Sequence, residues 1–99
     1  MASKQSDGQR ETVGRVMHEY KHGELKSRGA GPKVKNPKQA VAIALHEAGA
    51  SRDQSPARRK QSLHRTKAKE ASGRTAEAET EGKARQDRTL ARNGRHRRH

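Results

Sequence analysis

The sequence contains no cysteine, tryptophan or phenylalanine, and Tyr20 is its single tyrosine. Without cysteine, the chain forms neither disulfides nor thiolate metal sites. With a single tyrosine and no tryptophan or phenylalanine, the chain lacks the aromatic platforms on which many proteins stack the bases of single-stranded nucleic acid. Long apolar runs are also missing: the longest, residues 40–45, is far shorter than the roughly twenty residues of a membrane-spanning helix. The sequence therefore predicts no membrane segment.

Acidic residues are scarce relative to basic ones. The chain has 24 Lys plus Arg against 11 Asp plus Glu, a formal net charge of +13. A charge of this size favours anionic partners, which include nucleic acid, an anionic membrane surface and acidic proteins. The first eight residues lack the apolar stretch of a secretory signal, so we expect a cytoplasmic protein. Only 26% of the residues are hydrophobic, which predicts one small domain and a chain that is not folded throughout.

The first candidate helix carries Val13, Val16, Met17 and Tyr20 at positions i, i+3, i+4 and i+7. This spacing places the four side chains on one face and predicts a helix over about 12–22. Gly14 lowers the helix propensity, and a glycine at position 23 is typical of a helix terminus. Residues 1–11 lack large apolar side chains after the first methionine, and we expect a disordered leader there.

The second candidate helix has the clearest local signals. Asn36 is a typical cap, Pro37 suits the first helical position, and the Gln39 side chain is placed to reach back to the cap amide. These signals predict a helix over 37–48 after a loop at 26–33. Its apolar residues Val41, Ala44, Leu45 and Ala48 share one face, and Ile43 points away from them. A helix that is apolar on most sides needs cover from more than one neighbour, so we expect a homodimer through Val41, Ile43 and Leu45.

The second half of the chain carries most of the charge. Residues 51–99 hold 15 Lys plus Arg and 6 Asp plus Glu, with Leu63 and Leu90 as the only large apolar residues. Such a segment predicts a basic tail that is disordered or transiently helical. The predicted fold class is therefore mostly α: a leader (1–11), a small helix-loop-helix core (about 12–50) and a largely disordered or partly helical basic tail (51–99).

One motif resembles a catalytic zinc site. His18, Glu19 and His22 match His-Glu-x-x-His, in which two histidines one turn apart bind zinc and the glutamate activates water. A catalytic zinc also needs a third protein ligand, for which His46 is the candidate. It needs a shaped cleft as well, and we do not expect so small a chain to form one. A surface metal site and a pair of solvent-facing histidines are the alternative interpretations. We predict no cofactor and no enzyme.

The basic clusters indicate contacts to phosphates. One cluster surrounds a glycine-rich turn that leads into the second helix, and the others lie along the tail. Lys and Arg that neutralise phosphates release condensed cations, and this gain needs no fixed structure. The residues predicted to bind nucleic acid are Arg28, Lys33, Lys35, Lys38, Arg58, Arg59, Lys60, Arg65, Lys67, Lys69, Arg95, Arg97 and Arg98.

Three segments of the chain carry a resemblance to a known family. Residues 16–26, 31–50 and 63–69 resemble domain of unknown function 6496, a family of short basic bacterial and phage proteins. The resemblance covers about residues 12–70. It implies a bacterial or phage origin and an intracellular setting, and it implies no activity.

The leading functional hypothesis is a nucleoid-associated protein that binds nucleic acid without reading its sequence, with DNA as the expected partner and RNA as the alternative. An alternative is a protein-interaction module that docks through the alanine-rich helix at 37–48. A third hypothesis is a zinc hydrolase that uses the motif at 18–22.

Overall fold

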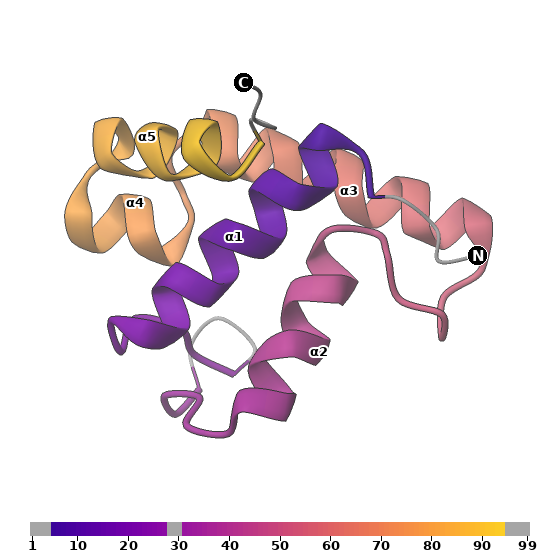
Figure 1. Ribbon diagram of the computed structural model, residues 1–99, viewed down its shortest axis with the longest axis horizontal. Coiled ribbons are helices and arrows are strands. Elements are labelled where there is room, and N and C mark those ends of the chain that lie inside the picture. The colour runs from indigo at the N-terminus through magenta and orange to yellow at the C-terminus, as the bar shows by residue number, and fades with distance from the viewer. Residues whose placement is uncertain (1–4, 28–30, 95–99) are drawn as a thin grey trace.

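The computed structural model describes residues 5–27 and 31–94, which form five helices and no strand. Helix α1 crosses the middle of the molecule, with α4 and α5 on one side and α2 on the other (Figure 1). It contacts each of the other helices. The prediction of a mostly α fold is confirmed. The helices are α1 (Asp7–Lys21), α2 (Pro37–Glu47), α3 (Pro56–Ala71), α4 (Ala76–Glu81) and α5 (Lys83–Gly94).

Helix α1 begins five residues earlier than the apolar pattern predicts. The backbone N–H of Gln9 donates to Ser6 Oγ at 3.2 Å, and Ser6 N–H donates to Gln9 Oε1 at 2.8 Å. This capping box satisfies two free amides at once, so residues 7–11 are helical rather than part of a disordered leader. Residues 1–4 lie outside the described residues. The helix ends at Lys21, and Gly23 follows with φ +71°, as predicted.

Helix α2 begins where its capping signal places it. The Asn36 side chain accepts a hydrogen bond from Lys38 N–H at 2.8 Å, and Pro37 is the first helical residue. The predicted return of the Gln39 side chain to the cap is wrong, because that side chain donates to Ser27 Oγ in the preceding loop at 3.1 Å. Within this loop, Lys26 and Lys33 form an isolated antiparallel bridge.

The buried face of α2 differs from the predicted one. Ala40, Ala44 and Ala48 are fully buried, whereas Val41 remains 46% exposed. Ile43, predicted to point away, packs against the core. Small side chains let two helix backbones approach closely, so the alanine face lies against α1 and the larger residues lie beside it. The apolar core consists of Val16, Leu25, Val34, Ala40 and Ala44, with Val13, Met17, Tyr20 and Ile43 packed around it.

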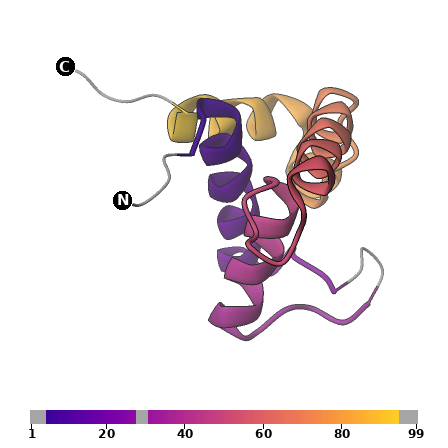
Figure 2. The same cartoon turned by 90° about the vertical axis from the view of Figure 1, so that its right-hand side faces the viewer.

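The second half of the chain has the helices that its composition allows, and they are packed rather than transient. Ser55 caps α3 by accepting from Arg58 N–H, and Thr75 caps α4 by accepting from Ala78 N–H. Helix α5 crosses the N-terminal half of α1 (Figure 2). The expectation of a largely disordered tail therefore fails for residues 56–94, and residues 95–99 lie outside the described part of the chain.

The reason for this packing is a polar core around Arg15. This side chain is buried, and its guanidinium forms ion pairs with Glu19 at 2.7 Å, Glu47 at 2.7 Å and Glu70 at 2.9 Å. Burial alone would lower the pKa of Arg15, but the three carboxylates raise it instead. Thr12 Oγ1 also donates to Glu70 at 2.8 Å. One cation thereby joins α1, α2 and α3.

Hydrogen bonds extend this polar core into α4 and α5. Glu77 N–H donates to the Glu19 carboxylate at 2.9 Å, and Thr89 Oγ1 donates to the Glu77 carboxylate at 2.6 Å. The buried Gln86 side chain accepts from Thr75 Oγ1 at 2.6 Å and donates to the Glu70 carbonyl at 3.0 Å. Helices with almost no large apolar residues are therefore fixed by paired polar side chains.

Helices α1 and α5 pack closely against each other at two glycines. A Cβ added at Gly14 would lie 2.5 Å from Asn93 Cβ, and one added at Gly94 would lie 2.6 Å from Glu11 Cγ. These distances are shorter than non-bonded carbon atoms tolerate. The glycine that weakens α1 as a helix is thus required where α5 crosses it.

Gly14→Ala is expected to destabilise the protein. Helix propensity alone predicts that the substitution raises the free energy of unfolding by about 1 kcal/mol, whereas the clash with Asn93 predicts that it lowers this free energy. Chemical denaturation measures the free energy of unfolding of both proteins. Gly8→Ala, in the first turn of α1, is the control, because its added Cβ would meet only the flexible end of Lys67 at 3.3 Å and the Ser6 hydroxyl at 3.9 Å. Equal effects at both positions would contradict the close crossing.

Arg15→Met is expected to lower the free energy of unfolding by about 3 to 5 kcal/mol, because it leaves buried carboxylates without their cation. Urea denaturation followed by circular dichroism measures the loss. Arg58→Met, on the exposed side of α3, is the matched control and should change stability by less than about 0.5 kcal/mol. A neutral Arg15→Met variant would show that the ion pairs do not maintain the fold.

Candidate nucleic-acid interface

Folding directs most carboxylates to partners within the chain. Among the described residues, eight of the chain's 11 acidic side chains form ion pairs, and their partners there are five Lys or Arg side chains and His18. Arg15 pairs with three carboxylates, and Lys67 pairs with two. Basic side chains remain at the surface in larger excess than the net charge alone suggests. The paired acidic residues are Asp7, Glu11, Glu19, Glu47, Glu70, Glu77, Glu81 and Asp87.

Helix α3 presents a basic stripe. Arg58, Arg65 and Lys69 recur at i, i+7 and i+11, a spacing that keeps them on one side of the helix, and all three are exposed. Arg65 and Lys69 line a hollow of about 300 Å³ together with His46 and Glu47 of α2. The stripe therefore borders the hollow between α2 and α3.

A second hollow continues the basic surface toward the loop before α2. It has a volume of about 550 Å³, shares His46, Glu47 and Lys69 with the first, and is also lined by Lys26 and Ile43. Lys26 faces Lys33 across the antiparallel bridge. The two hollows thus connect Lys26 with Arg65 and Lys69. We define the basic track by these three residues and by exposed cations that adjoin them: Lys33 opposite Lys26, Lys35 and Lys38 close to Lys33 along the chain, and Arg58 on the same side of α3.

Three other predicted nucleic-acid-binding residues, Lys67, Arg59 and Lys60, are not part of this track. Lys67 pairs with Glu11 at 3.0 Å and with Glu70 at 2.8 Å, so its charge is used within the fold. Arg59 donates to the carbonyls of the α2–α3 loop, and Lys60 is exposed on another side of α3. Arg28, Arg95, Arg97 and Arg98 lie outside the described residues.

Sequence reasoning missed several surface residues of this kind. Lys26 belongs to the track, but the sequence pattern predicts it only as part of a loop and not as a binding residue. On α5, Arg88 and Arg92 are exposed, and Arg92 lines a hollow of about 520 Å³ beside α1. The missed signal is their spacing at i and i+4, which identifies a basic stripe once α5 is known to be a helix.

The His-Glu-x-x-His motif lies at the C-terminal end of α1, and its glutamate lies apart from its two histidines. The rings of His18 and His22 stack with centroids 4.1 Å apart. Glu19 is buried in the Arg15 cluster, where burial raises its pKa despite the neighbouring guanidinium. Beside the rings, burial and then the carboxyl of Glu81 raise the pKa of Glu24 to about 8. His46, the candidate third ligand, borders the hollows between α2 and α3.

The residues predicted for a homodimer have different environments. Val41 is exposed, Ile43 packs against the apolar core and Leu45 is half-buried. The homodimer stays a prediction, with Val41 as its exposed member. For the described part of the chain, no helix has the length and apolar character needed to cross a membrane.

Comparison with protein families identifies a family for this chain. The model of a family of unknown function, DUF6496, matches residues 4–60, which is more than half of the chain. This stretch contains α1, α2 and the first turn of α3. No curated protein and no solved structure matches the chain.

Proposed function

We propose that this chain, which belongs to the family of unknown function DUF6496, binds the phosphate backbone of double-stranded DNA through the basic track. The observation that supports this proposal is the separation of charges: most carboxylates pair within the fold, whereas the cationic side chains of the track are exposed. No ion pair joins a track residue to a carboxylate within the described residues. Such a surface favours phosphates over other ligands because each neutralised phosphate releases a condensed cation.

The geometry favours contact to the backbone rather than to base edges. The track consists of long, flexible side chains around shallow hollows, and Tyr20 packs against the apolar core, where it is not available for stacking. Phosphate contacts fix position and carry no direct sequence information. Binding without sequence preference, as in a nucleoid-associated protein, follows from these features.

Two alternatives receive less support from the geometry. A zinc hydrolase needs Glu19 beside the two histidines, and this carboxylate is instead held by Arg15 and the Glu77 amide. Docking through α2 needs an exposed apolar face, and Val41 is the one large apolar residue that is exposed in the described part of the chain.

Binding is expected to fall steeply with salt and to depend on the track. Fluorescence anisotropy with a short DNA duplex, at two or more salt concentrations, measures both properties. Arg65→Gln with Lys69→Gln should weaken binding and reduce the salt slope by about two, because two phosphate contacts are lost. Lys83→Gln is the control, since Lys83 is exposed like the track residues but pairs with Asp87 at 2.8 Å.

Three outcomes would contradict the proposal. Absence of binding to duplex DNA at low salt would exclude it. An equal loss in Lys83→Gln would show that total charge acts without a defined surface. Tighter binding to an RNA duplex of the same length would assign the track to RNA instead.

A further inference from the structure

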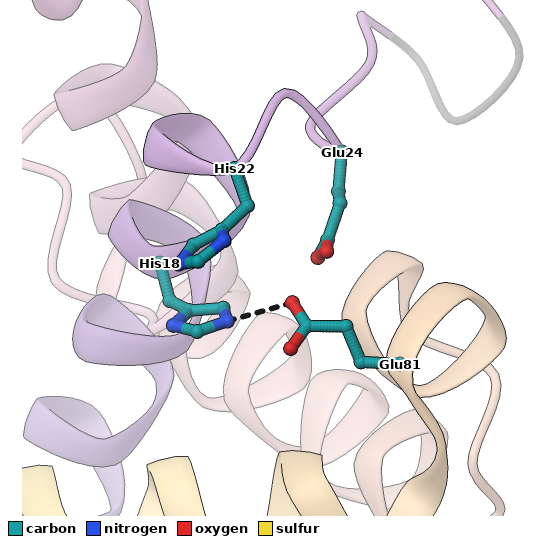
Figure 3. Close-up of side chains that lie close together, drawn as sticks. All are labelled: His18, His22, Glu24 and Glu81. Carbon is teal, nitrogen blue, oxygen red and sulfur yellow. Dashed lines mark hydrogen bonds and ion pairs between the residues drawn. The ribbon is translucent and has the colours of Figure 1, made fainter.

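Four potential metal ligands converge at the end of α1. His18 and His22 extend from its last turn, Glu24 from the turn that follows, and Glu81 from the end of α4 (Figure 3). One ligand atom from each side chain lies within 4.8 Å of all the others. In a tetrahedral zinc site the ligand atoms are about 3.4 Å apart, so small side-chain rotations would close this group around a cation.

The surroundings of the four side chains favour a cation over an empty cluster. Oε1 of Glu24 is buried and has no hydrogen-bond partner, which marks an unused electron pair beside the histidine rings. The carboxylate of Glu77 adds negative charge 3.3 Å from His18 Nε2. The C-terminal ends of α1 and α4, which carry partial negative charge, both lie here.

We propose that His18, His22, Glu24 and Glu81 bind one zinc-like divalent cation that fastens α4 to the end of α1. Two imidazole nitrogens and two carboxylate oxygens suit zinc and similar transition metals, whereas magnesium and calcium prefer oxygen ligands throughout. Two carboxylates also balance the charge of the ion. The site does not depend on nucleic-acid binding by the track.

The site is structural rather than catalytic. Four protein ligands fill a tetrahedral shell and leave no position for water or substrate. A catalytic base is also missing, because Glu19 belongs to the Arg15 cluster. The histidine pair of the motif thus keeps the spacing of a zinc site while its glutamate has another role, and the two remaining ligands come from positions that the motif does not specify.

Zinc titration of tag-free, chelator-treated full-length protein tests the proposal. We expect one zinc ion per chain by elemental analysis and a rise in melting temperature of about 10 °C when zinc is in hundredfold excess over its Kd. His22→Ala and Glu81→Gln should each remove stoichiometric binding and the thermal shift. Glu79→Gln, on the exposed side of the same helix, and His64→Ala on α3 are matched controls that should retain both.

Cobalt substitution tests the geometry of the same site. Cobalt(II) in a tetrahedral site gives intense visible bands, and we expect these bands in the wild type and not in His22→Ala. Since the His22 ring is exposed, its removal is compatible with folding even if Glu81→Gln is not. Weak six-coordinate spectra, zinc binding that survives His22→Ala, or equal loss in His64→Ala would each overturn the proposal.

Discussion

The fold depends on the buried guanidinium of Arg15. Three carboxylates from α1, the end of α2 and α3 converge on it. A charge removed from water is tolerated only when its partners are complete, so the cluster forms only when all three helices are in place. This requirement gives a chain with few large apolar residues a single arrangement. It also explains why α1 lies at the centre, since Arg15 and its neighbours Thr12 and Glu19 bond to residues of α2, α3 and α4.

The sequence predicts the parts of the fold that follow from apolar spacing and capping. The stripe from Val13 to Tyr20 and the Asn36 cap identify α1 and α2 because the signals are local. The packing of the second half escapes this reasoning because its buried face is polar. Thr12, Arg15 and Glu19 are spaced at i, i+3 and i+7, as an apolar stripe would be, but polar residues in that pattern are typical of a solvated face. Their partners Glu47, Glu70 and Glu77 are distant in sequence, so no local pattern shows that these three residues are buried.

The same limit applies to the candidate interface. Composition predicts a cationic surface, and local clustering finds Arg58, Arg65 and Lys69. Composition does not show which cations are used internally: Lys67, two residues before Lys69, lies on another side of α3 and pairs with Glu11 and Glu70. Because each residue turns the helix by about 100°, a step of two residues separates Lys67, which pairs within the fold, from Lys69 on the surface. To tell which of the two lysines is used within the fold, one needs the position of α1 relative to α3, and no short segment of the sequence specifies this position.

The polar core and the histidine cluster are parts of one network. Helix α4 has six residues, too few to be stable alone, and its position rests on the bond from Glu77 N–H to Glu19 and on the contact of Glu81 with His18. Glu77 connects the two parts, because its carboxylate accepts from Thr89 of α5 and lies beside His18. A cation held by the cluster would therefore act on α5 as well as on α4. Helix α5 also packs directly on α1 at Gly14 and Gly94, so the exposed Arg88 and Arg92 keep their place beside α1 through this crossing as well as through α4.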